Sequence, residues 1–167
     1  MSGRESVGPA VLKLRFTRTA PDRHRFAFVR PDGSGEQLEL ETHSFLRHDL
    51  VHFAVEREAG LRGSFYGLLA KVGGYQELTL AGESLGGEAA QTEMVVGPLQ
   101  TALKADFDAK TFVQRVAEYR ADMDLEPIRW LNADLVARIA ERVRQLEGRW
   151  KATPFGETME LTFELGR

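Results

Sequence analysis

Residues 44–60 read SFLRHDLVHFAVEREAG, and the rest of the chain is organised around this stretch. Thr42 or Ser44 can cap the start of a helix here, because a short hydroxyl side chain accepts a hydrogen bond from a free N–H of the first turn. Gly60 stands where a left-handed residue commonly ends a helix. Residues 44–59 are therefore predicted to be helical.

Apolar residues recur on two sides of this helix, at about 100° per residue. One side carries Leu46, Leu50 and Phe53, and the other carries Val51 and Val55. A helix that is apolar on more than one side is buried or lines a cleft, and Arg47 and Glu58 project on a different side that suits its solvated face. We expect the helix to pack on a sheet through its first apolar side.

A polar stripe separates the two apolar sides and holds the residues best suited to chemistry. These are His48, Asp49, His52 and Glu56. Ionisable groups on a buried or cleft-lining helix need partners, because an unpaired polar group costs about 1–3 kcal/mol. The stripe is therefore the candidate functional site, with His48 and His52 as its central pair.

The spacing of the two histidines is typical of a metal-binding helix. Histidines at positions i and i+4 project from one helix face and can share a tetrahedral Zn²⁺ ion. Zincin peptidases place a general-base Glu directly after the first histidine, and here that position is Asp49, a candidate catalytic base or ligand-orienting residue. Glu56 follows His48 by about 12 Å along the helix axis, which is too far for one shared ion.

The sequence does not single out a third metal ligand. His43, at the junction between strand and helix, is one candidate, and His24 or a carboxylate such as Glu39 are others. Without a third ligand, the histidines on the stripe can equally be buried residues hydrogen-bonded to neighbouring carboxylates, or a pH-sensitive cluster. Zinc binding by His48 and His52 is therefore an open expectation, and catalysis by the metal is a narrower one.

Two motifs resemble a group of small uncharacterised bacterial proteins. Residues 48–56 (HDLVHFAVE) are similar to the HDLTHYAVE-like helix of that group, and residues 65–70 (FYGLLA) are similar to the FFGL-like segment after it. Trp150 and residues 159–163 (MELTF) are similar to its ending. The resemblance implies that the helix is a hallmark of the group, and it implies no activity, cofactor or functional residue.

An aromatic pair follows the helix. Ser64 can cap a short helix that begins with Phe65 and Tyr66. Beside Gly67 these rings can wall a pocket or pack into the core. Phe65 and Tyr66, together with Glu56, are the candidate pocket residues.

Composition bounds the class of protein. The 167 residues are 43% hydrophobic and 28% charged, which is typical of a globular chain. We expect a flexible leader over residues 1–9 and a single domain over 10–167. A net charge of −3 gives no general attraction for nucleic acid or an anionic membrane. No cysteine is present, so any metal needs nitrogen or oxygen ligands. No apolar run approaches the roughly 20 residues of a membrane span, and a cytoplasmic bacterial protein is expected.

The remaining periodicities predict an α+β fold of two layers. An antiparallel sheet of about five strands is expected to be covered on one face by about four to five helices. Strands are predicted at 11–18, 24–30, 36–42 and 157–165, with a further one beginning at Trp150. The other predictions are a short helix from 65, a loop over 75–87, helices over 88–105 (kinked or broken at Pro98) and 109–123, and a long helix from 131 that ends at Gly148.

Two functions stay open. We favour a non-catalytic accessory or binding protein in which the polar stripe of the helix is structural. The alternative is a zinc-dependent, hydrolase-like protein that uses His48, Asp49 and His52, because water on a metal ionises near neutrality. Neither the partner nor the substrate can be derived from these residues.

Overall fold

The computed structural model describes residues 10–71 and 73–166, so the predicted leader over residues 1–9 lies outside the described residues. The fold is α+β, as predicted. In chain order the elements are β1 (Val11–Ala20), β2 (Arg23–Val29), β3 (Gly35–Glu41), α1 (Thr42–Ala59), α2 (Phe65–Leu69), α3 (Tyr75–Ala81), the 3₁₀ helix η1 (Gly82–Leu85), α4 (Gly87–Ala102), α5 (Ala109–Asp122), α6 (Ala133–Ala152) and β4 (Thr158–Glu164).

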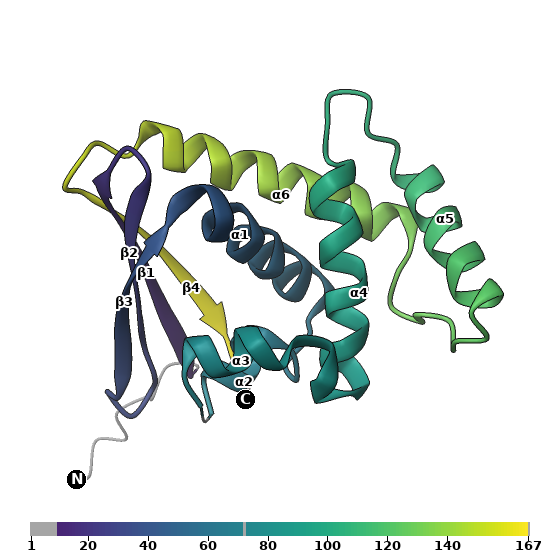
Figure 1. Ribbon diagram of the computed structural model, residues 1–167, viewed down its shortest axis with the longest axis horizontal. Coiled ribbons are helices and arrows are strands. Elements are labelled where there is room, and N and C mark those ends of the chain that lie inside the picture. The colour runs from purple at the N-terminus through teal and green to yellow at the C-terminus, as the bar shows by residue number, and fades with distance from the viewer. Residues whose placement is uncertain (1–9, 72, 167) are drawn as a thin grey trace, which may run out of the picture.

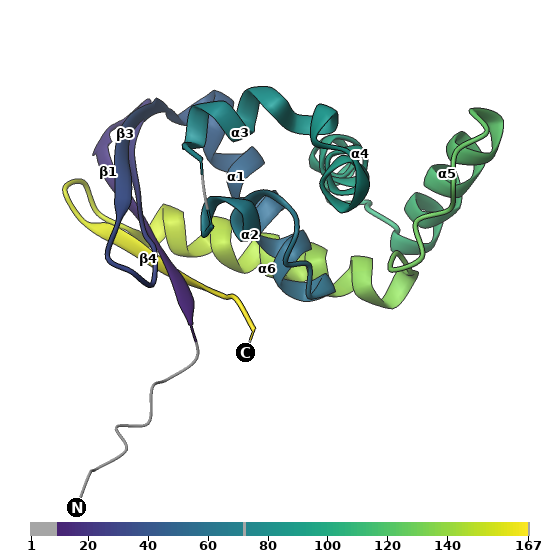
Figure 2. The same cartoon turned by 90° about the horizontal axis from the view of Figure 1, so that it is seen from below.

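The sheet has the order β3-β2-β1-β4, and every pair of neighbours is antiparallel. The first and last parts of the described chain thus meet, because β4 pairs with β1 through the register Leu14↔Leu161. Leu12, Leu14 and Phe16 point to one face and are fully buried, as the alternation of the strand predicts. Figures 1 and 2 show the helices on that side of the sheet only.

Helix α1 is the centre of the molecule, because it joins two hydrophobic clusters. Leu46, Leu50 and Phe53 pack with the sheet in the first cluster, which confirms the predicted contact. Val51 and Val55 pack with α4, α5 and α6 in the second cluster. The polar stripe lies between these two contacts, and three of its side chains, Asp49, His52 and Glu56, are buried there.

The caps of α1 agree with the prediction at one end only. Gly60 ends the helix with a φ of 69°, in the left-handed conformation. At the other end the cap is Glu41, whose side chain accepts hydrogen bonds from the N–H groups of His43 and Ser44. The prediction of Thr42 or Ser44 was therefore wrong, because the last residue of β3 already has the extended backbone that a cap requires.

Helix α6 corrects the predicted fifth strand. It does not end at Gly148 but continues to Ala152, and Trp150 is its last buried residue, 8% exposed. Trp150 keeps the spacing of Val143 and Leu146, so burying its ring on the sheet favours helix over strand. The sheet of the described chain accordingly has four strands rather than about five.

Residues 75–87 differ from the prediction, and at Pro98 the helix is not broken. The predicted loop contains α3 and η1, and α3 forms because Tyr75 and Leu78 are buried together in the sheet-facing cluster. Helix α4 passes through Pro98 without ending there. The described residues therefore contain six α-helices, whereas four to five were expected.

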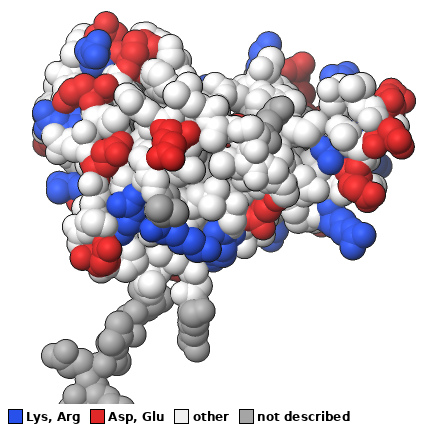
Figure 3. All heavy atoms as spheres, turned by 60° about the horizontal axis from the view of Figure 1, so that its bottom comes forward, with Lys and Arg blue, Asp and Glu red and all other residues white. Residues whose placement is uncertain are grey.

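The surface carries both signs of charge. On the face drawn in Figure 3, basic side chains gather in a band near the lower margin of the main body, while acidic side chains are scattered. Among the helices of residues 10–71 and 73–166, none is both long enough and apolar enough to cross a membrane.

Candidate metal centre

The two histidines of the stripe lie side by side on α1. The rings of His48 and His52 are 4.6 Å apart between centroids. Their exposure differs, since the side chain of His48 is 31% exposed and that of His52 only 2%. The pair therefore has a buried end at His52 and an end open to solvent at His48.

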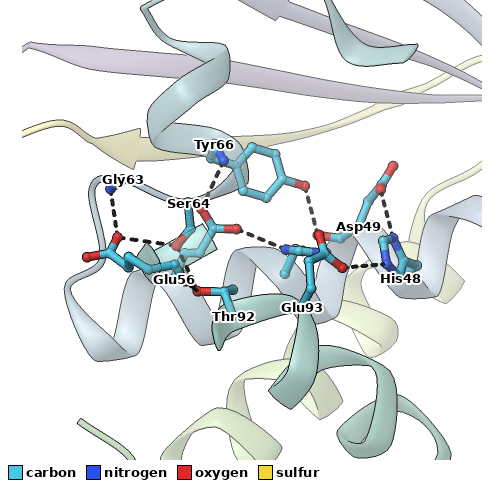
Figure 4. A network of polar contacts seen from close by, with 10 residues as sticks. His48, Asp49, Glu56, Gly63, Ser64, Tyr66, Thr92 and Glu93 are labelled. Carbon is cyan, nitrogen blue, oxygen red and sulfur yellow. Dashed lines mark hydrogen bonds and ion pairs between the residues drawn. The ribbon is translucent and has the colours of Figure 1, made fainter. Parts of the chain in front are cut away.

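A third side chain, Glu93 of α4, meets this pair. One carboxylate oxygen of Glu93 lies 3.0 Å from Nε2 of His52, and the other lies 4.0 Å from Nε2 of His48. Figure 4 shows the Glu93 carboxylate reaching from α4 toward His48. In the described part of the chain, His48, His52 and Glu93 form a group whose ligand atoms all lie within 4.8 Å of one another. We call this group the triad.

Hydrophobic contacts and a buried hydrogen bond together hold α4, and with it Glu93, against α1. Val95 and Leu99 of α4 belong to the second hydrophobic cluster with Val51 of α1. A buried hydrogen bond of 2.7 Å between the hydroxyls of Ser64 and Thr92 fixes the same stretch of α4 against the segment before α2.

Glu88, one turn and a half before Glu93 on α4, strengthens this attachment. Its Oε1 accepts hydrogen bonds from the N–H of Gly63 and the hydroxyl of Ser64 (Figure 4). The contacts of Glu88 and of Thr92 hold α4 beside the stripe. The packing of the helix therefore fixes where the backbone of Glu93 lies.

A further carboxylate lies behind His52. Oε2 of Glu56 is 3.1 Å from Nδ1 of His52, and its Oε1 accepts a 2.9 Å hydrogen bond from the N–H of Tyr66. Glu56 is outside the triad, as its distance along the helix axis predicted. Its contact with Nδ1 of His52 fixes the orientation of this ring, as carboxylates behind metal-binding histidines do.

Asp49 takes the corresponding place behind His48. Its Oδ1 is 3.6 Å from Nδ1 of His48, and its Oδ2 accepts a 2.7 Å hydrogen bond from the hydroxyl of Tyr75. Its backbone carbonyl accepts another from the hydroxyl of Tyr66. The Asp49 carboxylate is 2% exposed and is not part of the triad. This position suits a residue that orients His48.

The carboxylates control the protonation of His52. Burial by itself lowers the pKa of His52, but the close contacts with the carboxylates of Glu56 and Glu93 outweigh burial and raise this pKa from 6.5 to about 9. The pKa of Glu93 is lowered, because its contacts with His52 and His48 outweigh its partial burial. Burial raises the pKa of Glu56. Without a metal, His52 is therefore a buried cation beside carboxylates.

One buried atom of the site has no well-aligned partner. Nε2 of His52 is within ion-pair distance of Glu93, yet it makes no hydrogen bond of acceptable angle to any described residue. The distance and the missing bond are consistent, because ion pairing requires proximity alone whereas a hydrogen bond also requires alignment. Once it has lost its proton, a histidine nitrogen without a well-aligned hydrogen bond can bind a metal ion.

The triad has donors and spacings that fit zinc. Ligand atoms about 2.0–2.1 Å from a tetrahedral zinc ion lie about 3.4 Å from one another. In the triad, one ligand atom from each residue lies within 4.8 Å of the others, so the three side chains would draw closer together around an ion. Two histidines and one glutamate also form a known catalytic zinc set, in which the fourth position stays open.

The other residues singled out from the sequence lie outside the triad. His43 is exposed in the first turn of α1, and Glu39 pairs with Arg25 on the surface. His24 is fully buried, and its Nδ1 is 3.1 Å from the hydroxyl of Thr42. Burial lowers the pKa of His24.

The candidate pocket residues are part of the packed interior. Phe65 is 7% exposed and Tyr66 is fully buried, and both belong to the sheet-facing hydrophobic cluster. The Phe65 ring lies 5.4 Å from the ring of His52 between centroids. These aromatic side chains therefore form an apolar wall on the inner side of the triad.

Sequence reasoning missed Glu93, and its local sequence explains why. Glu93 stands in the stretch AAQTEMVVG, which contains no histidine and matches no metal-binding motif. Only the short distance from its carboxylate to the two histidines of α1 makes Glu93 a candidate ligand. No protein-family model, curated protein or solved structure matches this chain.

Proposed function

We propose that this protein binds a divalent metal ion of the zinc type through His48, His52 and Glu93. The observation that carries the proposal is Glu93, which reaches the His48–His52 pair from a different helix. Two elements then contribute ligands, and a site built across packed helices is more rigid than one on a single helix.

The surrounding residues support a metal rather than a bare ion pair. Glu56 and Asp49 stand behind the two histidines, so each imidazole has a carboxylate near the nitrogen that the metal would not use. His48 and Glu93 are partly exposed, which leaves an access route on one side. A zinc ion held there would supply Lewis acidity at an open fourth position.

We assign Asp49 a positioning function in this proposal rather than the role of general base. Its side chain is only 2% exposed, and its Oδ2 already accepts the hydrogen bond of the Tyr75 hydroxyl. A base has to be within reach of the proton that it removes.

The experiment is a titration of metal-free protein with Zn²⁺, followed by calorimetry and by thermal unfolding. We expect one ion per chain and a rise in melting temperature, because a ligand that binds the native state stabilises it. His48→Ala, His52→Ala and Glu93→Gln should each abolish stoichiometric binding. Glu118→Gln on α5 is the matched control and should bind zinc like the wild type.

The Glu56→Gln variant tests the carboxylate that stands behind His52 and is not itself a ligand. Loss of an outer carboxylate typically weakens metal binding by about 10–100-fold without abolishing it. Wild-type zinc affinity in Glu93→Gln, or no stoichiometric binding and no thermal shift in the wild type, would exclude the metal proposal.

A structural role of the same network is the second candidate, and one observation favours it. His52, as a cation between Glu56 and Glu93, already forms a compensated buried group without metal. In that case the protein is an accessory or binding protein, and chelator treatment leaves its melting temperature unchanged. Glu93→Gln then destabilises the fold, because a buried charge loses a partner.

A further inference from the structure

A groove runs between α4 and α5, on the side of α4 away from the sheet. Its volume is about 480 Å³, which is within the range of about 300–1,000 Å³ typical of sites for small ligands. In Figure 1 the two helices stand next to each other at the end of the molecule opposite the sheet. The groove is lined by Glu93, Met94, Phe112, Arg115, Val116 and Arg120, among others.

Arg120 is the unusual member of this lining. It is 6% exposed, and its guanidinium donates to the backbone carbonyl of Glu126 and lies 3.2 Å from the sulfur of Met94. Among the described side chains, which leave out that of Glu83, no carboxylate lies within ion-pair distance of Arg120. Burying a charge without a counter-charge is costly, so an anionic group that reached Arg120 would gain from pairing with it.

The groove also adjoins the triad. Glu93 lines it, and the same carboxylate contacts His52 and His48. The negative charge of Glu93 is therefore already balanced by the histidines and does not neutralise Arg120. Met94, Phe112 and Val116 give the groove an apolar wall between its charged residues.

We infer that this groove binds a small ligand that has an apolar body and a carboxylate group. The carboxylate pairs with Arg120, with Arg115 as a second cation at the exposed side, and the apolar body packs on Phe112 and Met94. This inference deepens the proposed function, since it names the substrate class of the triad. Binding in the groove is independent of the metal, whereas the assignment as substrate rests on the metal proposal.

The first test compares two probes of the same shape on metal-free protein. 3-Phenylpropionate carries the carboxylate, and 3-phenylpropionamide replaces it with an uncharged amide. Titrations followed by ¹⁵N chemical shifts should show the acid binding at least about tenfold tighter than the amide, because bonds to charged groups are the stronger ones. The shifts should concentrate on α4 and α5. Equal binding of acid and amide, or no binding of the acid, would overturn the inference.

The second test uses variants with a matched control. Arg120→Met keeps most of the side-chain length and removes the charge, and it should weaken binding of 3-phenylpropionate at least about tenfold. Arg138→Met on the exposed side of α6 makes the same exchange away from the groove and should bind like the wild type. Unchanged affinity in a folded Arg120→Met variant would overturn the assignment. If this variant does not fold, the comparison of acid and amide on the wild type decides.

The third test joins the groove to the metal. Co²⁺ in place of zinc is paramagnetic, so it broadens the proton resonances of a ligand bound beside the triad. Protein that binds Co²⁺ and the acid without broadening would overturn the substrate assignment. Protein that binds the acid but no Co²⁺ would overturn that assignment together with the metal proposal, while the groove as a binding site stands.

Discussion

His52 shows how two opposing effects decide the state of one residue. Burial alone would keep its imidazole neutral, yet Glu56 and Glu93 contact its two nitrogens and favour the cation. A metal ion would replace the proton on the nitrogen that faces Glu93. Metal and proton therefore compete for the same atom.

The raised pKa of His52 predicts a loss of stability at high pH. The folded pKa of about 9 exceeds the ordinary value of 6.5, so the folded chain holds the extra proton between these values. The contribution is fully present below about pH 6.5 and is lost as the pH rises through about 9. Its size approaches about 3 kcal/mol for a shift of this extent.

Denaturant unfolding of metal-free protein from about pH 6 to about pH 10 measures this effect, with His52→Gln as reference. The free energy of unfolding of the wild type should fall relative to the variant across the window. A constant difference between the two proteins would mean that His52 does not hold the proton.

At the scale of single elements, two glycines show opposite reasons for being present. A Cβ built on Gly67 of α2 would lie 1.9 Å from the carbonyl oxygen of Arg62, so only glycine lets this turn approach the chain. A Cβ built on Gly148 of α6 meets no other atom within 4 Å. The first glycine is required by packing, whereas the second only weakens its helix.

The same substitution should therefore change stability in opposite directions. Gly67→Ala is expected to destabilise the protein by about 1–3 kcal/mol or more, because backbone has to move. Gly148→Ala should stabilise it by about 0.5–1 kcal/mol, because alanine loses less entropy in a helix. Thermal and denaturant unfolding of both variants checks the pair. A stabilised Gly67→Ala variant would contradict the close approach of α2.

At the scale of the whole molecule, α5 is far less buried than α1. Only Phe112 and Arg120 are buried in it, whereas α1 is buried on both its sheet side and its helix side. Figures 1 and 2 show α5 at the margin, apart from the sheet. Arg47–Glu147 and Arg142–Glu58 ion pairs add contacts between α1 and α6, and α5 contributes to neither.

Hydrogen exchange should reveal this difference. Segments with few buried contacts open at a lower free energy than the core, so the amides of α5 should exchange faster than those of α1. Native-state exchange read by NMR measures both helices in one sample, and α6 is an internal control. Equal protection of α5 and α1 would show that α5 opens only with global unfolding.

Local signals in the sequence predicted the sheet and α1 well. Alternation in β1 and β4 is a period-2 pattern that depends on neighbours in the chain. The errors fell where packing overrides a local signal. Gly148 has the residue type of a helix end, yet burial of Trp150 keeps α6 helical, and burial of Tyr75 orders α3 within a stretch that reads as a loop.

The sequence by itself determined the part of the candidate site that lies on α1. His48, Asp49, His52 and Glu56 share one stripe of α1 because helical periodicity places them there, whatever the rest of the chain does. Glu93 became part of the site only in the tertiary structure, since it stands on another helix far along the chain. Burial of valine and leucine side chains between α1 and α4 brings the two helices together, and no short-range pattern encodes that contact.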